Sequence, residues 1–565
     1  MPKPLYKSMR QSFSRDVYMA VSGLVAAPAV ILEVDTEEDL RLLSSNTPPQ
    51  DLLIHVSSDL YVVGKDKRRL APLYDVLDRA RRSIPILAID SDETADTLAR
   101  FLDENRLLDA LLLATYENRD LLRRSYQKMP ALRCILDCRT ATVSHRELLK
   151  EATLASASAV ILRHGDVTRE AADYLNTRYL KVISTDGGGI DTVAARGANG
   201  IITKDLAGAY RFLSLFPEGS ILEKRRLVAH KGFTNRGQYP ENTTSATVAA
   251  GKAHFDASEI DVKLTQDGVP IVTHNPTTKD MFLGDPIIPE ESDYATVAAL
   301  RRTEFPSEGI DRFEDLMAAM KDYPDTPVVI ELKPQAKYHA LEELTSLTRE
   351  ILERPESQQD CVVIMGTLDP GLRYVHDHLP GVPVAHCEGG KNTPEAPKSR
   401  MEAEYRLYRI ALLTAGCAAG YNCEETRINR LFNEYAGLRM LTVFPWSYGY
   451  STWEENGARH EETYLSGYTM WTTDHGQYFF GCPLSVEAIP PTSVHFRPKG
   501  ILTFRDGSTC EGDCELLVLS GDVSRSEDGF CTVTGEARVM YGRRIDLSLG
   551  SSYTIYSEPI TISET

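Results

Sequence analysis

The chain has 565 residues, of which 42% are hydrophobic and 25% charged, and this is the composition of a folded globular protein. A chain of this length exceeds what one hydrophobic core supports, so we expect several domains. Its formal net charge of −19 argues against a nucleic-acid partner, and an acidic protein that handles an anionic phosphate needs a local cation.

The first 32 residues allow two interpretations. Basic residues within the first fifteen positions precede a mostly apolar run, as in a targeting segment. However, Asp16 directly precedes that run, and residues 29–35 (AVILEVD) have the pattern of a buried strand. The compartment stays open: the sequence as written favours the cytoplasm, whereas a targeting segment over residues 1–32 would place the protein outside the cell or at its surface. No other stretch approaches the ~20 apolar residues that a transmembrane segment needs.

Residues 1–222 alternate short apolar runs with helical patterns. The strand candidates, in chain order, are AVILEVD, DLLIHVS, IPILAID, ALLLATY, LRCILDC, SAVILRH, LKVISTD and NGIITKD. Eight strands separated by helices predict parallel βα units that close into a barrel. His55 and His164 could end strands, but neither has an acidic pair beside it, so we predict a barrel without a catalytic site.

The same alternation restarts in residues 223–487. The strand candidates are RLVAH, ASEIDVKL, GVPIVTH, PVVIELK, CVVIMGT, VPVAHC, AAGYNC, RMLTVFP and YTMWTTD. GVPIVTH follows a tight turn and predicts a hairpin with the strand before it, which leaves eight strands for a second barrel. Residues 73–90 parallel 313–332, and 194–205 parallel 462–474, so we predict two tandem barrels packed as pseudo-symmetric partners. The first could then shape the mouth of the second or bind substrate.

Acidic residues gather on two strands of the second barrel. Side chains alternate faces along a strand, so Glu259 and Asp261 point the same way, and Glu331 and Lys333 do so on another strand. Three converging carboxylates repel one another unless a cation lies between them, and hard oxygen ligands select Ca²⁺ or Mg²⁺. The sequence therefore predicts one divalent cation at this mouth.

Two histidines complete the predicted site. His230 and His274 lie at strand ends on the rim where barrel active sites are found, and imidazole suits general acid and base roles near neutral pH. Lys333 and the cation would hold the phosphoryl oxygens. An E-x-D pair alone is more often a solvated edge or an ion-pair partner. Several polar residues in barrel register favour a site instead.

These motifs resemble the glycerophosphodiester phosphodiesterase family over residues 226–485. They are His230-Lys231-Gly232, Pro240-Glu241-Asn242-Thr243, Glu259-Ile260-Asp261-Val262, Thr265-x-Asp267-Gly268, His274 and Glu331-x-Lys333. The resemblance implies a TIM barrel that hydrolyses glycerophosphodiesters to an alcohol and glycerol 3-phosphate with one divalent metal. It also implies that the weak repeat in residues 29–210 is a degenerate copy of the same barrel.

The resemblance assigns roles residue by residue. Glu259, Asp261 and Glu331 match the family's metal-binding carboxylates, His230 and His274 match its acid–base pair, and Lys333 matches its phosphate-binding lysine. In related enzymes the attacking group is the substrate's own glycerol hydroxyl, which gives a cyclic phosphate. Direct attack by metal-bound water is the alternative, and the sequence leaves both routes open.

Four positions bear on the identity of the substrate more than on the catalytic chemistry. Lys231 and Asn275 stand where the family usually has Arg and Asp. Because lysine cannot make the two-pronged phosphate contact of arginine, Arg236 in the extended loop FTNRGQY is a candidate for it. Trp446 is a candidate for the apolar wall against the glycerol carbons, or a core residue.

Residues 488–565 show a different pattern, with alternating apolar and polar residues and turns every 8–12 positions. This pattern predicts a small antiparallel β-sandwich, similar to immunoglobulin-like modules, that binds a surface or a glycan or braces its neighbour. Bracing is the simplest role, because no site is apparent.

The expected protein is therefore α/β, with two TIM (β/α)₈-like barrels followed by a β-sandwich. Its domains are a degenerate, non-catalytic barrel (1–222), a catalytic barrel (223–487) and the sandwich (488–565). We predict metal-dependent hydrolysis of a small-molecule glycerophosphodiester by histidine acid–base catalysis. The alternatives are a phosphodiesterase for another lipid- or glycan-linked diester and a non-catalytic binding protein on the same fold. The oligomeric state stays open.

Overall fold

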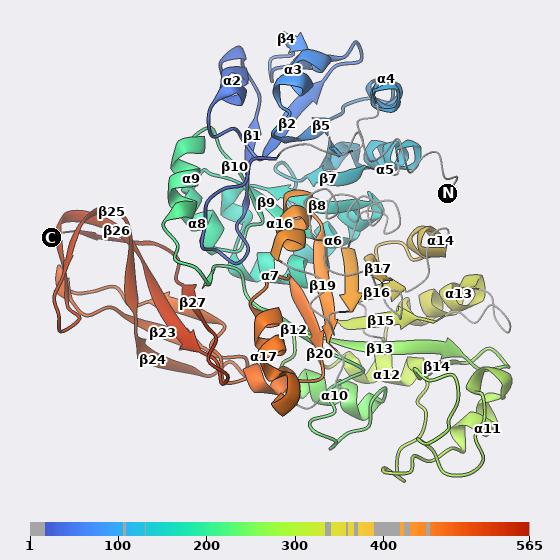
Figure 1. Cartoon of the computed structure of the whole chain (residues 1–565). Coiled ribbons are helices and arrows are strands. Elements are labelled where there is room, and N and C mark those ends of the chain that lie inside the picture. Colours follow the sequence, from blue (N-terminus) through green and yellow to red (C-terminus); the bar gives the residue numbers. More distant parts are fainter. Residues whose placement is uncertain are drawn as a thin grey trace.

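A computed structural model of the chain contains two α/β barrels and a set of C-terminal β-sheets (Figure 1). It describes residues 17–105, 109–129, 132–333, 341–357, 360–365, 371–388, 418–422, 430–447 and 453–563. No helix among these residues is long and apolar enough to cross a membrane.

The first barrel is a closed ring of eight parallel strands, in which β1 pairs with both β2 and β10. The strands are β1 (Ala29–Glu33), β2 (Asp51–Val56), β5 (Ile84–Ala88), β6 (Leu111–Thr115), β7 (Arg133–Asp137), β8 (Ala157–Leu162), β9 (Lys181–Thr185) and β10 (Gly200–Ile202). The helices around them are α2 (Glu37–Arg41), α3 (Leu73–Arg79), α4 (Asp92–Glu104), α5 (Arg119–Lys128), α6 (His145–Leu154), α7 (Arg169–Thr177), α8 (Ile190–Ala195) and α9 (Leu206–Ser214). All eight predicted strands are confirmed, and the N-terminal apolar run ends in β1. The antiparallel extension β3 (Tyr61–Val63) and β4 (Arg69–Pro72) was not predicted.

The second barrel repeats this arrangement, with β12 pairing with both β13 and β20. Its strands are β12 (Arg226–Ala229), β13 (Ala257–Leu264), β15 (Val328–Leu332), β16 (Cys361–Met365), β17 (Val384–Glu388), β18 (Ala418–Asn422), β19 (Thr442–Ser447) and β20 (Met470–Thr473). The predicted hairpin is confirmed, because β14 (Pro270–Val272) runs antiparallel to β13. The helices are α10 (Thr244–Lys252), α11 (Tyr294–Ala298), α12 (Phe313–Met320), α13 (Leu341–Leu352), α14 (Gly371–His378), α16 (Arg430–Leu438) and α17 (Trp453–Tyr464).

Local sequence explains these elements. The strands of the first barrel are β-branched and leucine-rich and are buried almost throughout, as parallel strands covered by helices must be. Between them, α4 begins at the Ser91 side chain, which accepts a hydrogen bond from the Thr94 amide, and buries the stripe of Ala95, Leu98 and Leu102. The same alternation of buried strand and one-sided helix closes both rings.

The two barrels contact each other base to base through equivalent loops. In each barrel the loop before the seventh strand inserts one residue into the interior of the other barrel. Tyr179, before β9, packs with interior residues of the second barrel and stacks on Phe444 with ring centroids 4.7 Å apart. Met440, before β19, packs among interior residues of the first barrel. Both inserted residues have positive φ, 65° and 53°, a conformation that non-glycine residues adopt only where the surroundings impose it.

A buried charge cluster reinforces this contact. Arg439 reaches from the second barrel to Asp109 of the first, with Nε–Oδ1 and Nη2–Oδ2 distances of 3.0 and 2.5 Å. Arg133 also donates to Asp109, at 2.9 Å, and all three side chains are almost completely buried. Burial, together with the nearby Asp109 carboxylate, raises the pKa of Asp51 well above its usual range.

Base-to-base packing puts the two barrel mouths at opposite ends of the pair. The predicted pairing of the barrels as pseudo-symmetric partners is therefore supported by the equivalent loops. The idea that the first barrel shapes the mouth of the second is wrong, because it is the bases that meet.

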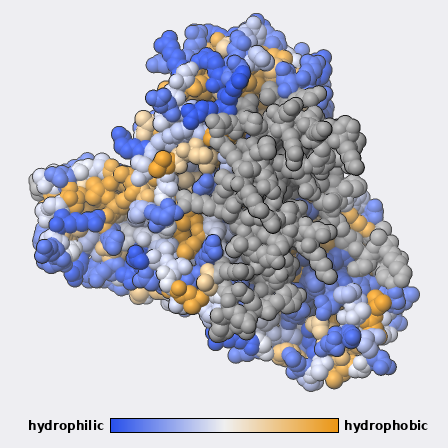
Figure 2. All heavy atoms as spheres, viewed as in Figure 1, coloured by the Kyte–Doolittle hydropathy of each residue, from blue (hydrophilic) through white to orange (hydrophobic). Residues whose placement is uncertain are grey.

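The C-terminal region forms two sheets beside the barrels (Figure 1). One contains β22 (His495–Phe496), β25 (Glu515–Arg525), β26 (Cys531–Asp546), β27 (Ser552–Tyr556) and β28 (Ile560–Ser563), with β11 (Ser220–Ile221) at its edge. The other contains β21 (Ser485–Ala488), β23 (Lys499–Thr503) and β24 (Thr509–Asp513). Apolar side chains are visible on this region in Figure 2. The strands are antiparallel except for β11 with β27, while the immunoglobulin-like sandwich stays a prediction.

Replacing Arg439 tests the base-to-base contact. The variant Arg439→Ala leaves the Asp109 carboxylate buried with less compensation, so we expect a loss of about 3–5 kcal/mol in the free energy of unfolding. Urea denaturation measures it, with the exposed Arg100→Ala as the control that should leave stability unchanged. Equal stability of the two variants would show that the cluster does not hold the barrels together.

Candidate active site

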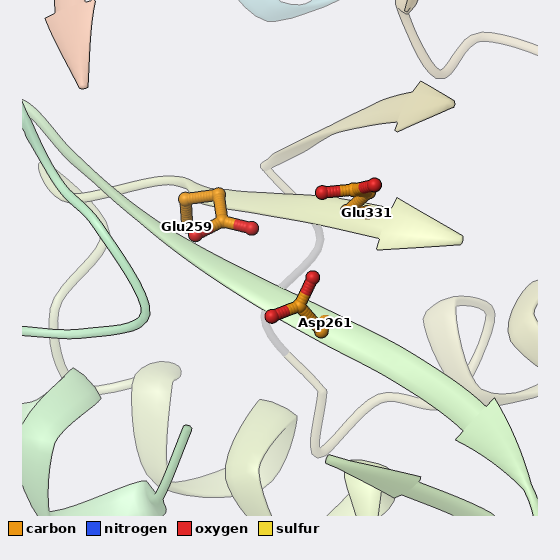
Figure 3. Close-up of side chains that lie close together, drawn as sticks. All are labelled: Glu259, Asp261 and Glu331. Atoms are coloured by element: carbon orange, nitrogen blue, oxygen red, sulfur yellow. The ribbon is translucent and has the colours of Figure 1, made fainter. Parts of the chain in front are cut away.

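Three carboxylates converge at the mouth of the second barrel (Figure 3). Glu259 and Asp261 are alternate residues of β13, and Glu331 lies beside Asp261 in the neighbouring strand β15. One oxygen from each carboxylate lies within 4.8 Å of the other two. The predicted alternation on β13 is confirmed by this geometry, and the set of hard oxygen donors fits a divalent cation such as Ca²⁺ or Mg²⁺.

Burial makes this arrangement electrostatically costly. Glu259 and Asp261 are each 1% exposed. Burial and the neighbouring Asp261 charge raise the pKa of Glu259 to about 8, and the same two causes raise the pKa of Glu331. Burial opposes ionisation of Asp261 as well, but the charges of Lys333, His274 and Lys231 lower its pKa. The cluster therefore calls for further positive charge.

Lys333 supplies part of that charge. Its ammonium lies 2.7 Å from Glu331 Oε1 and 3.1 Å from Asp261 Oδ1. Burial opposes its charge, but the two carboxylates outweigh burial and raise its pKa. The predicted phosphate-binding lysine thus lies directly against two of the predicted metal ligands.

His230 follows β12 and is held by a residue that the sequence did not single out. Its Nδ1 lies 3.0 Å from Asp474 Oδ1, directly after β20, the strand that pairs with β12. Burial opposes protonation of His230, but the Asp474 hydrogen bond and charge raise its pKa. Because Nδ1 is held by this hydrogen bond, Nε2 is the ring nitrogen that is left to exchange a proton with a substrate. Asp474 lay in the strand motif YTMWTTD, yet only the ring closure brings it to His230.

His274 follows the hairpin strand β14 and is oriented by the next residue. Its Nδ1 lies 3.0 Å from the Asn275 side-chain oxygen. Burial lowers the pKa of His274. Orienting an imidazole requires a hydrogen-bond acceptor at one ring nitrogen. Asn275 provides that acceptor, although it departs from the family pattern.

The turn between β12 and α10 carries two further contacts to the carboxylates. The Lys231 amide donates to Glu259 Oε2 at 2.8 Å, and its ammonium lies 3.4 Å from Glu241. Asn242 exchanges two hydrogen bonds with Asp261, from Nδ2 to Oδ2 at 2.8 Å and from the Asp261 amide to Oδ1 at 3.0 Å. Thr243 then caps α10 by accepting from the Ala246 amide. Sequence analysis assigned Asn242 no role beyond its place in the motif.

Two other predicted substrate residues are not joined to this cluster by any described contact. Arg236 is exposed, and its guanidinium lies 5.1 Å from the centre of the Tyr478 ring. Trp446 lies in β19, with its backbone beside Thr472 of β20, and its side chain is outside the described residues. Their contacts with substrate stay predictions.

The first barrel lacks an equivalent carboxylate set among its described residues. The inward-facing residues near the mouth ends of β2 and β5 are Leu53, His55 and Ala88. Glu33, at the end of β1, accepts two 3.0 Å hydrogen bonds from the Arg139 guanidinium, which also contacts Asp137. An arginine bridge thus joins the ends of β1 and β7, whereas β2 and β5, the strands equivalent to β13 and β15, have no carboxylate at these described inward positions.

A comparison with the sequence models of protein families finds a match in the second barrel. Residues 230–370 match the sequence model of the Glycerophosphoryl diester phosphodiesterase family. This span includes both histidines, the three carboxylates and Lys333. No curated protein matches the chain.

Several solved structures are similar to this chain. A phosphodiesterase from Oleispira antarctica, in complex with the product sn-glycerol-3-phosphate, is 18% identical with a TM-score of 0.36, covering 45% of this chain and 94% of that one. A glycerophosphodiester phosphodiesterase from Parabacteroides distasonis is 16% identical with a TM-score of 0.35, covering 44% and 93%. A putative one from Galdieria sulphuraria is 15% identical with a TM-score of 0.37, covering 44% and 94%.

The family match and the clustered motif residues lie in the same part of the second barrel. Over residues 230–370 this barrel is therefore similar to the glycerophosphoryl diester phosphodiesterase family.

Proposed function

We propose that the second barrel hydrolyses glycerophosphodiesters to an alcohol and glycerol 3-phosphate with the aid of one divalent cation, Ca²⁺ or Mg²⁺. The observation that carries this proposal is the set of three buried carboxylates within 4.8 Å, flanked by two histidines inside the segment that matches the family. A structural ion cluster would not need two imidazoles at the strand ends beside it.

Glu259, Asp261 and Glu331 would hold the cation. When bound, the cation withdraws charge from the phosphoryl oxygens and so favours attack at phosphorus. Lys333, against two of the carboxylates, and Lys231, whose buried ammonium lies at the same mouth, are the cations of this chain that bind the phosphoryl oxygens. Lys231 thus takes the place of the family's arginine as a point charge rather than a two-pronged donor.

The two histidines take the two proton-transfer roles. Asp474 holds Nδ1 of His230, as in a carboxylate–histidine pair, which suits a general base that takes the proton from the attacking hydroxyl. His274, the second imidazole at the mouth, is then the general acid that gives a proton to the leaving alcohol oxygen. The attacking hydroxyl belongs to water or to the glycerol group of the substrate. Attack by water gives glycerol 3-phosphate directly. Attack by the glycerol hydroxyl releases the alcohol and leaves a cyclic phosphate, which a water molecule then opens to glycerol 3-phosphate.

Replacing one carboxylate tests the assignment. Glu259→Gln keeps the shape of the side chain and removes a ligand charge, so we expect loss of both cation binding and hydrolysis of glycerophosphocholine. Calorimetry with Mg²⁺ or Ca²⁺ and a choline-release assay measure the two effects. The control Glu93→Gln, at an exposed position of helix α4 in the first barrel, should behave as wild type. Wild-type turnover by purified Glu259→Gln would overturn the site.

Cation binding should depend on pH. Because the pKa of Glu259 is raised to about 8, this carboxyl holds a proton at lower pH, and a cation must displace it. We therefore expect the apparent affinity for Mg²⁺ or Ca²⁺ to rise between pH 6 and pH 8, with proton release on binding. Calorimetry in two buffers of different ionisation enthalpy counts the protons released. Chelation should abolish turnover, and either cation should restore it. A pH-independent affinity without proton release would contradict the arrangement.

Replacing Asp474 tests how His230 is oriented. Asp474→Asn removes the charge that raises the His230 pKa and the acceptor that fixes its Nδ1. We expect kcat to fall roughly 10–100-fold, the usual effect of losing an orienting partner, with KM little changed. Steady-state kinetics with glycerophosphocholine and a thermal melt measure activity and folding together. A folded variant with wild-type kcat would exclude the role of Asp474.

A further inference from the structure

The inner face of β13 carries a third charged residue that the proposed chemistry does not use. Lys263 follows Glu259 and Asp261 at the same two-residue spacing, so all three lie on one face of the strand. Its side chain is 2% exposed, and it is among the largest fully enclosed side chains described. A buried ammonium has to be compensated, and its partners show what it holds.

The first partner lies on the segment between β14 and α12. Lys263 Nζ is 2.7 Å from Oε1 of Glu290, which lies in the short helix η4 (Pro289–Glu291) and is 3% exposed. The same segment is fixed to the rim elsewhere, because Arg302 donates to the Glu241 carbonyl at 2.9 Å. The segment is thus tied both to the strand of the metal ligands and to the loop after His230.

The second partner is the residue that orients His274. Lys263 Nζ donates to the Asn275 carbonyl oxygen at 3.2 Å. The Asn275 side chain contacts His274 Nδ1 through its oxygen, at 3.0 Å, and its Nδ2 lies 2.8 Å from the sulfur of Met281. Asn275 is therefore held at its backbone and at both ends of its amide, with the imidazole attached to it.

Stability alone is a weak reason for this ion pair. Moving two charges from water into the protein interior carries a large desolvation cost, which their mutual attraction has to offset. A protein with a well-packed apolar pair of similar volume in place of the ion pair is often as stable or more stable. A pair that served only to fasten the segment could therefore be apolar. The contact that an apolar pair cannot replace is the hydrogen bond to Asn275.

We propose that Lys263, held in place by Glu290, is a positioning residue for His274: it fixes the Asn275 carbonyl and thereby the imidazole that protonates the leaving alcohol. This inference rests on the proposed function. Lys263 does not touch the reacting atoms in this assignment, and it acts through Asn275 alone.

A pair of substitutions separates positioning from folding. Lys263→Met alone leaves Glu290 buried and unpaired, so we expect a lower melting temperature as well as lower kcat. In the double variant Lys263→Met/Glu290→Leu, both charges are gone, and we expect the melting temperature to return close to wild type. Because the Asn275 carbonyl stays unheld, kcat for glycerophosphocholine should remain at least about 10-fold below wild type, with KM changed less than about 2-fold.

A largely buried ion pair at the base of the barrels provides the control. Arg178 lies 3.2 Å from Asp360, on the side of the barrels away from the mouth, so Arg178→Met/Asp360→Leu should alter melting temperature without lowering kcat. Hydrogen–deuterium exchange of residues 276–312 reports independently whether the double variant keeps the segment ordered. Recovery of both stability and kcat in the Lys263/Glu290 double variant would overturn the positioning role. Absence of turnover by the wild-type protein would instead reject the proposed function itself.

Discussion

The mouth of the second barrel depends on one constraint, the convergence of three carboxylates in a buried place. Oxygens within 4.8 Å of one another cannot all be charged without compensation, as the raised pKa values of Glu259 and Glu331 show. Polar groups from three parts of the barrel compensate this charge: Lys333 directly after β15, the Lys231 amide in the loop after β12, and Asn242 in the turn before α10. A bound cation would complete the same compensation, so the residues that stabilise the carboxylate cluster are also those that would surround the phosphoryl group.

The first barrel serves this site from behind rather than from its rim. Its base receives Met440 and Arg439, and in return it places Tyr179 against Phe444 inside the catalytic barrel. Each barrel therefore lacks part of its own core when alone, and the buried Asp109 of the first barrel is compensated by an arginine of the second. Phe444 lies on β19, next to β20, the strand that Asp474 follows. The contact at the base thus reaches strands that lead to candidate site residues at the mouth.

Sequence periodicity predicted the strands because each buried parallel strand is a continuous apolar run, whatever its partners are. It also predicted that Glu259 and Asp261 point the same way, because side chains two residues apart in a strand lie on the same face. The contacts that periodicity did not predict join residues that are far apart in the chain. Asp474 meets His230 only because the ring closes between β12 and β20, and Lys263 meets Glu290 through a segment without strong periodicity. The positive-φ residues Tyr179 and Met440 carry no turn signature at all, since tertiary packing imposes their conformation.

The two barrels differ in a way that follows from where they meet. Their bases are an interface, so a change there has to suit both barrels at once, and the equivalent loops before the seventh strands still insert in the same manner. Their mouths are separate, so each could change alone. In the first barrel, Arg139, which follows β7, contacts both Glu33 of β1 and Asp137 of β7 and compensates their charges. In the second, the carboxylates stay close together and only partly neutralised by protein cations. In the first mouth, the arginine of the chain itself compensates the acidic side chains, so no ligand is needed for that purpose. In the second mouth, the carboxylates still lack part of the positive charge that would compensate them, and this suits the mouth to bind a metal ion and, with it, a phosphate.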